Sequence, residues 1–190
     1  MEKSESRNQI IFDGWILEKL QCHDDIAAFD CGDPDLTEYF RHDSLFYRQE
    51  LLTQTYCFYR QGETQCEAVA LVDFCNDSLG RNLIPNRNRR QINNRKRGYR
   101  SFPALKITRL GVDEFHRKMG IGSKLLDTVK LFFVTDNRSG CRFLTVDAYR
   151  AARGFYEKNG FVPALLPGEE ENPQSPTLPM FYDLHRIIVD

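Results

Sequence analysis

The sequence predicts an α/β domain built on a mixed β-sheet, and three observations support this fold class. The chain has 190 residues with 41% hydrophobic content and 14 phenylalanines, enough to bury the core of one compact domain. Two segments rich in β-branched and aromatic residues, Thr53–Tyr59 and Glu67–Phe74, flank a glycine turn, which is typical of an antiparallel hairpin. After this hairpin, strand-like and helix-like segments alternate, as in sheets that contain parallel strands. We therefore expect residues 1–190 to form a single domain.

Before the hairpin we expect a tail, a strand and a helix. Residues 1–12 start with a polar stretch of mixed charge, and we expect them to form a mobile tail. Trp15–Leu20 has the composition of a short first strand. The next helix is predicted to begin near Asp33 and to extend to about Leu52. The Asp33 side chain can accept hydrogen bonds from the first helical amides, and Pro34 suits the first helical position.

Beyond the hairpin, loops, strands and helices are predicted in turn. Ser123–Val134 places its apolar residues on one stripe at helical spacing, and Gly160 suits the position that ends the last helix. Two segments that contain Pro, Gly, Asn or clustered charges are expected to be loops, a basic insertion at 76–103 and a second loop at 163–179. The other expected elements are strands at 104–112 and 142–146, a helix at 150–159, and a closing strand made of 180–184 and 187–189.

The charges are distributed unevenly along the chain. The formal net charge is −1, from 26 basic and 27 acidic residues. No acidic residue lies between Asp77 and Asp113, whereas 10 basic residues do, so the rest of the chain carries a net charge of −11. This asymmetry points to a nucleic acid or another anionic partner, and it leaves open a solvated loop that aids solubility. The basic residues are Arg81, Arg87, Arg89, Arg90, Arg95, Lys96, Arg97, Arg100, Lys106 and Arg109.

The sequence also argues against several classes of protein. No apolar run approaches the roughly 18 residues that a membrane span needs, and the polar start has no apolar stretch of the signal-peptide type. The six cysteines have no C-x-x-C spacing and the four histidines have no metal-ligand spacing, so we expect reduced thiols and no metal site. We therefore expect a cytoplasmic, metal-free protein with no membrane partner.

The most informative segment is a turn between the predicted strand at 104–112 and the helix that follows it. Gly120 and Gly122 open this helix, and glycine there lets a ligand approach the backbone closely. The first helical amides lack partners within the helix, and the helix dipole favours an anion beside them. Lys118 and Lys124 add positive charge. The segment predicts a phosphate-binding turn, with an ordinary glycine-started helix as the alternative.

The segment Arg117–Gly122 resembles the pyrophosphate loop of the GNAT acetyltransferase superfamily, which is written R/Q-x-x-G-x-G/A. Further along, a strand and a helix that ends in Tyr156–Phe161 resemble the family's second signature, Y-x-x-x-G-F. The resemblance extends from about Trp15 to Leu184. It implies the GNAT fold, with a mixed central β-sheet, flanking helices and a splayed central strand. It also implies acetyl-CoA as cofactor and the transfer of an acetyl group to a primary amine.

The family's motifs imply roles for residues of this chain, position by position. Leu110, Gly111 and Val112 would lie on the splayed strand, whose backbone pairs with the pantetheine arm and polarises the thioester carbonyl. Tyr156 would protonate the departing thiolate of coenzyme A, with a packing role as the alternative. Tyr149 stands where many members have asparagine, a departure that concerns side-chain contacts to coenzyme A and not the fold. The residues that would hold the pyrophosphate are Arg117, Lys118, Met119, Gly120, Ile121, Gly122 and Ser123.

Within the superfamily, the chain resembles the TacT-like toxin branch, which acetylates aminoacyl-tRNA. Phe29–Phe40 is similar to that branch's opening F-x-C/S-G-x-x-x-L-x-x-Y-F, and Pro103–Val112 is similar to its proline-containing loop and following strand. The resemblance implies the α-amine of aminoacyl-tRNA as acceptor, and it leaves open a cognate antitoxin and a homodimer. The basic loop would then bind RNA through Arg87, Arg89, Arg90, Arg95, Lys96, Arg97 and Arg100.

The predicted strand at 104–112 carries no Asp, Glu or His, although many GNATs that act on protonated amines place a carboxylate there. A lysine amine of pKa ~10.4 is only about 0.1% neutral near pH 7.4, whereas an α-amine of pKa ~7.7–8.0 is about a quarter neutral. An enzyme without a strong base can therefore use an α-amine, unless Asp73, Asp113 or water supplies the base. Two alternatives stay open, a GNAT for a small-molecule or protein amine and a non-catalytic module that binds acyl-CoA or nucleic acid.

Overall fold

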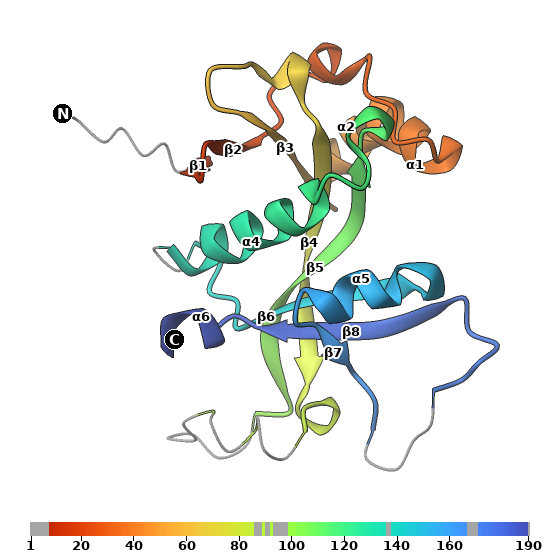
Figure 1. Cartoon of the computed structure of the whole chain (residues 1–190). Coiled ribbons are helices and arrows are strands. Elements are labelled where there is room, and N and C mark those ends of the chain that lie inside the picture. The colour runs from red at the N-terminus through yellow and green to blue at the C-terminus, as the bar shows by residue number, and fades with distance from the viewer. Residues whose placement is uncertain are drawn as a thin grey trace. The chain divides into compact units, whose positions relative to one another are not determined.

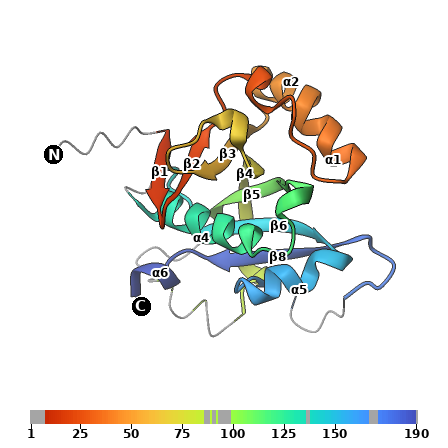
Figure 2. The same cartoon turned by 45° about the horizontal axis from the view of Figure 1, so that its top comes forward.

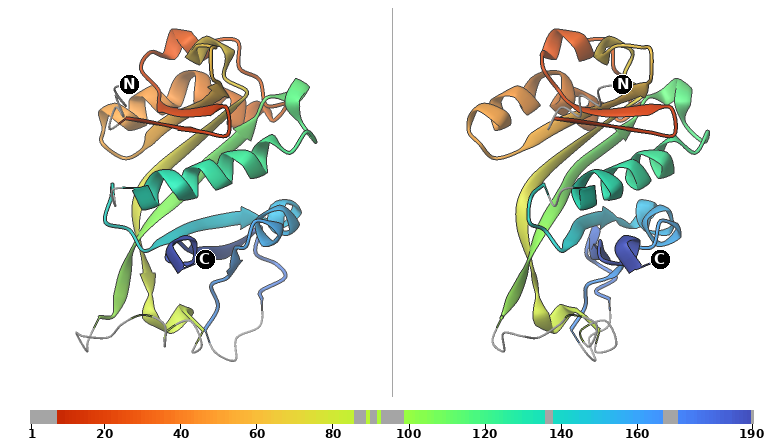
Figure 3. Two further views of the ribbon diagram at one scale, coloured as in Figure 1. Left: turned by 60° about the vertical axis from the view of Figure 1, so that its left-hand side comes forward. Right: turned by 90° about the vertical axis from the view of Figure 1, so that its left-hand side faces the viewer.

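The computed structural model describes residues 8–85, 89, 92, 99–135, 138–166 and 171–189, and the chain divides into two compact units. Unit 1 comprises Met1–Cys75 and Ile107–Phe132, and unit 2 comprises Asn76–Lys106 and Phe133–Asp190. Two long strands, β4 (Ala70–Gly80) and β5 (Ser101–Val112), are neighbours in the sheet and contribute to both units (Figure 3).

Unit 1 contains an antiparallel run of strands in the order β1-β2-β3-β4, followed by β5. The hairpin of β3 and β4 confirms the predicted pairing. The expected tail over residues 1–12 was wrong for its last part, because residues 9–12 form β1 and pair with β2. The hairpin turn uses Asp13 and Gly14, whose φ values of 50° and 74° suit a tight connection between twisted strands. The first three strands are β1 (Gln9–Phe12), β2 (Trp15–Lys19) and β3 (Gln54–Arg60).

The predicted helix after the first strands is confirmed as one bent, continuous helical segment (Figure 2). Asp33 caps it as expected, since its Oδ1 accepts a hydrogen bond from the Leu36 amide at 3.0 Å, and Pro34 occupies the first helical turn. The segment consists of α1 (Pro34–Glu38), a π-helical turn (Tyr39–Asp43) and α2 (Ser44–Gln49).

After β5, helix α4 (Ile121–Val134) packs on the sheet of unit 1, where the ring of Phe132 lies 5.4 Å from that of Tyr56 on β3 (Figure 1). An apolar cluster fills the space between the sheet and the α1–α2 segment, and Phe40 and Leu20 in it are completely buried. Short 3₁₀ turns complete the unit, η1 (His23–Ile26), η3 (Gln65–Glu67) and η5 (Glu114–His116).

Unit 2 continues the sheet in the order β4-β5-β6-β8-β7, and the whole sheet is mixed, as predicted. Its core joins Phe102, Phe143 and Phe181, with ring centroids 5.7 to 6.0 Å apart. Its elements are η4 (Arg81–Leu83), β6 (Phe143–Tyr149), η7 (Arg150–Ala152), α5 (Arg153–Lys158), β7 (Val162–Pro163), β8 (Thr177–Asp183) and α6 (Arg186–Val189).

The closing strand is shorter than the sequence predicted. Residues 187–189 belong to α6, so the expectation of strand there was wrong. The cause is local: the Asp183 carboxylate accepts a hydrogen bond from the His185 amide at 3.0 Å and the Leu184 carbonyl accepts one from Ile187 at 3.2 Å, which turns the chain out of the sheet.

Both predicted loops are also shorter than expected. The Arg81 amide donates to the Arg100 carbonyl at 2.9 Å, which extends the pairing of β4 and β5 beyond the predicted ends of the basic insertion. The connection between these strands therefore runs from 81 to 100 rather than over 76–103, and the second loop covers 164–176 rather than 163–179.

Candidate functional site

The predicted phosphate-binding turn lies in unit 1, between β5 and α4. Asp113 organises the connection. Its carboxylate accepts a hydrogen bond from the Phe115 amide at 3.1 Å and contacts Nδ1 of His116 at 3.0 Å, while its amide donates to the Val69 carbonyl at 2.9 Å. This carboxylate is thus engaged in holding the turn and is poorly suited to act as a free base.

The backbone of the turn adopts left-handed conformations at two positions. Lys118 has φ 62° and Gly120 has φ 79°, a conformation that costs energy for lysine and little for glycine. A Cβ placed on Gly120 would meet no atom within 4 Å, so a ligand can reach the backbone there. The Gly120 carbonyl accepts hydrogen bonds from Ser123 and Lys124 at 3.1 Å, which starts α4 and directs its first amides outward. The turn therefore suits an anion.

The end of β5 packs closely on the loop before α1. A Cβ on Gly111 would lie 3.2 Å from Cε2 of Phe40 and 3.3 Å from Cβ of Cys31, so a side chain there would require its neighbours to move by a few tenths of an ångström. Gly111 is buried, and its neighbours Leu110 and Val112 are half-buried. The three predicted strand residues are thus held in place from one side.

Arg117 was expected to hold the pyrophosphate, but in the structure its side chain contacts the loop before α1. Its Nη2 donates a hydrogen bond to the Cys31 carbonyl, and its guanidinium lies against Gly32, where a Cβ would be 3.1 Å from both Nη atoms. Ile121 is buried, whereas Arg117, Lys118, Met119 and Gly120 are exposed. The predicted pyrophosphate residues therefore share one turn but do not all face its outer surface.

Sequence reasoning named Asp73 only as a possible base and missed its network. Asp73 is 0% exposed, and its Oδ2 accepts hydrogen bonds from the hydroxyls of Tyr39 at 2.6 Å and Thr108 at 2.9 Å. Its Oδ1 accepts a third from Thr55 at 2.9 Å. Burial is the main cause that raises the pKa of Tyr39, and the hydrogen bond to Asp73 raises it further. One signal could have revealed the cluster, an acidic residue within the apolar run of β4.

Tyr156 lies on α5 in unit 2. Its ring is 7% exposed and packs edge-on against Phe155 and Phe161, with centroids 5.1 and 5.3 Å away. Among the described residues none forms a hydrogen bond with its hydroxyl. Burial raises the pKa of Tyr156 to about 12, which keeps the hydroxyl protonated at neutral pH. Tyr149, which stands where many GNATs have asparagine, is 70% exposed.

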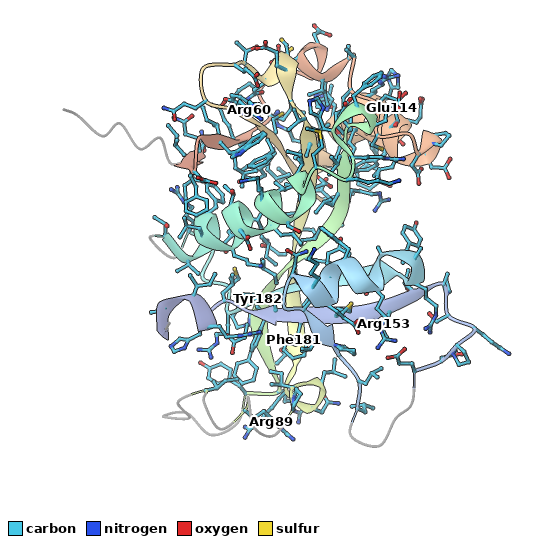
Figure 4. The ribbon with its side chains drawn as sticks, in the orientation of Figure 1. Arg60, Arg89, Glu114, Arg153, Phe181 and Tyr182 are labelled. Atoms are coloured by element: carbon cyan, nitrogen blue, oxygen red, sulfur yellow. The ribbon has the colours of Figure 1, made fainter. Side chains whose placement is uncertain are left out.

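The basic connection joins β4 to β5 in unit 2, and Figure 4 labels Arg89 within it. The Arg89 amide donates to the Pro85 carbonyl at 3.0 Å, and the exposed Arg100 lies next to β5. The other arginines and the lysine predicted to bind RNA fall outside the described residues, namely Arg87, Arg90, Arg95, Lys96 and Arg97.

The described residues contain no group of three or more His, Cys, Asp or Glu side chains able to hold a metal ion. No helix among them has the length and apolar character needed to cross a bilayer.

The chain matches a known protein family over the segment that contains the site. The family model for the acetyltransferase (GNAT) domain matches residues 68–163, half of the chain. That segment includes the end of β5, the predicted phosphate-binding turn and Tyr156. No curated protein sequence matches significantly.

Several solved structures share the fold. AtaT complexed with acetyl-methionyl-tRNAfMet aligns with a TM-score of 0.71 and 20% identity, covering 92% of this chain and 98% of that one. A tyrosine-to-phenylalanine variant of KacT aligns with a TM-score of 0.69 and 20% identity, covering 93% and 99%. AtaTR bound with acetyl-CoA aligns with a TM-score of 0.66 and 20% identity, covering 94% and 98%.

Proposed function

The chain belongs to the GNAT acetyltransferase family and is an acetyl-CoA-dependent N-acetyltransferase, and we propose that its acceptor is the α-amine of an aminoacyl-tRNA. One observation carries the choice of acceptor, the 10 basic and no acidic residues between Asp77 and Asp113 in an otherwise acidic chain. The fold shared with AtaT, solved in complex with acetyl-methionyl-tRNAfMet, supports the same choice.

The turn before α4 fits the diphosphate of the donor. The open backbone at Gly120 and the outward amides of the first turn of α4 would bind the phosphate oxygens. The backbone of Leu110–Val112 would pair with the pantetheine arm and polarise the acetyl carbonyl. Bound acetyl-CoA supplies an activated thioester. Tyr156 would donate its proton to the leaving sulfur, because a tyrosine hydroxyl carries its proton at neutral pH.

The two candidate carboxylate bases are already engaged. Asp73 is completely buried and accepts three hydroxyl hydrogen bonds, and Asp113 holds the turn through Phe115 and His116. Deprotonating a lysine amine costs about 3 kcal/mol more than deprotonating an α-amine at neutral pH. Because both carboxylates are already hydrogen-bonded, they favour an acceptor whose amine is partly neutral at neutral pH without a base from the enzyme.

The acceptor is tested by offering the purified protein labelled acetyl-CoA with aminoacyl-tRNA, free polyamines and amino acids, and lysine-containing peptides. We expect label in the aminoacyl group of tRNA at a rate at least about 100-fold above that for the other amines, because the tRNA adds phosphate contacts. Acetylation of a small amine or a peptide lysine at a higher rate would replace the proposal with the corresponding alternative. Absence of coenzyme A release with any acceptor would favour the non-catalytic alternative.

Charge reversal in the basic connection tests how the acceptor binds. Changing Arg87, Arg89 and Arg90 together to glutamate should raise KM for aminoacyl-tRNA by about 10- to 100-fold and reduce its salt dependence by about one unit of log–log slope per lost phosphate contact. Activity toward a small aminoacyl ester should stay unchanged, since it has no phosphate backbone. The matched control is reversal of Arg60, an exposed arginine of β3 in unit 1. Equal loss with both acceptors would contradict an RNA-binding role.

A further inference from the structure

Two segments far apart in the sequence are joined in unit 1, the α1-leading loop (residues 30–33) and the turn after β5. The Glu114 amide donates to the Asp30 carbonyl at 2.9 Å, and Figure 4 labels Glu114 at this junction. Three residues later the Arg117 guanidinium donates to the Cys31 carbonyl. These contacts attach the phosphate-binding turn to the α1-leading loop at both ends of η5.

The contact of Arg117 depends on the absence of a side chain at residue 32. Gly32 has φ 70°, and a Cβ there would lie 3.1 Å from both Nη atoms and 3.2 Å from Cζ of Arg117. The guanidinium is the far end of a flexible side chain, so a methyl group at residue 32 would push it away by a few tenths of an ångström, while the positive φ adds backbone strain at residue 32 itself. Gly32→Ala is therefore a way to disturb the contact of Arg117 without changing Arg117 itself.

The α1-leading loop is held in place by several hydrogen bonds. The Asp30 carboxylate accepts hydrogen bonds from the Gly32 amide at 2.7 Å and the Thr37 hydroxyl at 3.2 Å, and the Cys31 amide donates to the same Thr37 hydroxyl at 3.2 Å. The Gly32 hydrogen bond is the main cause that lowers the pKa of Asp30, and the positive charge of Arg117 contributes to the shift. Arg117 thus donates to a carbonyl and lies close enough to the Asp30 carboxylate to affect its pKa.

Arg117 also directly precedes Lys118, whose left-handed φ of 62° is unfavourable for a residue with a side chain. A tether one residue upstream opposes relaxation of that conformation. We propose that Arg117 is a positioning residue. It fixes the turn that binds the donor's diphosphate by anchoring it to the α1-leading loop, and it does not itself contact the phosphates. The inference rests on acetyl-CoA being the donor and is independent of the acceptor.

A double-mutant cycle tests this role, with calorimetric Kd for coenzyme A and the thermal midpoint measured for each variant. Arg117→Met should raise Kd about tenfold, which corresponds to the loss of one charged hydrogen bond. Gly32→Ala should raise it about fivefold or more, and the double variant should bind no worse than the weaker single variant. Gly14→Ala is the matched control, because Gly14 has φ 74° and a Cβ there meets no atom within 4 Å. Its Kd should stay within about twofold of the unchanged protein.

Two further measurements separate positioning from direct phosphate contact. Arg117→Lys keeps the charge but loses the planar fork, so positioning predicts a raised Kd, whereas a phosphate contact predicts affinity close to that of arginine. Positioning also predicts that Arg117→Met leaves the salt dependence of Kd unchanged. The proposal is overturned if Gly32→Ala behaves like Gly14→Ala, if lysine restores affinity, or if the thermal midpoints fall while Kd stays constant. Because coenzyme A binding is the readout, failure to acetylate tRNA would not affect this result.

Discussion

Replacing Tyr156 with phenylalanine is expected to lower turnover by about 10²- to 10⁴-fold, the range for loss of a positioned general acid. The Kd for coenzyme A should stay within about twofold, because the change removes one hydroxyl and leaves the turn proposed to bind the donor intact. The ring keeps its edge-on packing against Phe155 and Phe161 at 5.1 and 5.3 Å, so the thermal midpoint should shift by about 2 °C or less. Single-turnover kinetics with a saturating acceptor measure the effect.

The control is Tyr149→Phe, which removes a hydroxyl from a tyrosine of the same unit that is 70% exposed. Its turnover should stay within about twofold. If Tyr156→Phe retains full turnover, Tyr156 has only the packing role. A pH profile gives a second check. With the pKa of Tyr156 raised to about 12, the hydroxyl stays protonated from pH 7 to 9, so this group should cause no loss of activity across that range.

Local sequence signals predicted those features of the site that depend on neighbouring residues. The cap at Asp33 and Pro34, the open backbone at Gly120 and the helix end at Gly160, where φ is 83°, each follow from the side chain, or its absence, at that position. The α/β alternation and the GNAT motifs followed for the same reason, because periodicity and short motifs are local properties.

Features that depend on contacts between distant segments could not be predicted in this way. Arg117 reaches Cys31, 86 residues earlier in the chain, and nothing near Arg117 indicates that its guanidinium turns there. The strand β1, by contrast, had a local signal that was missed, since Ile10, Ile11 and Phe12 lead into Asp13-Gly14, a dipeptide typical of a tight hairpin. The loops predicted at 76–103 and 163–179 were both too long for a similar reason. Pairing between neighbouring strands extends the sheet beyond its apolar residues.

Truncating Asp73 is expected to be the most destabilising single change in unit 1. Asp73→Ala should lower the free energy of unfolding by about 3–5 kcal/mol, because the hydroxyls of Tyr39, Thr55 and Thr108 lose their buried acceptor. Asp73→Asn should cost about 1–3 kcal/mol. An amide keeps one acceptor oxygen, and a rotating threonine hydroxyl can accept from its NH₂ group. Urea unfolding of each variant gives these values.

Asp77→Ala is the matched control, because Asp77 lies on the same strand, is half-buried and accepts a hydrogen bond from the hydroxyl of Thr145 alone among the described side chains. It should cost about 1 kcal/mol or less. Equal losses at the two positions would mean that the three-hydroxyl network contributes nothing beyond an ordinary hydrogen bond. The free energy of unfolding at alkaline pH gives an independent check through Tyr39, whose pKa is raised in the folded protein. Its contribution to stability is complete below pH ~10 and is lost as pH rises toward the higher folded value, so Tyr39→Phe should flatten the decline above pH ~10.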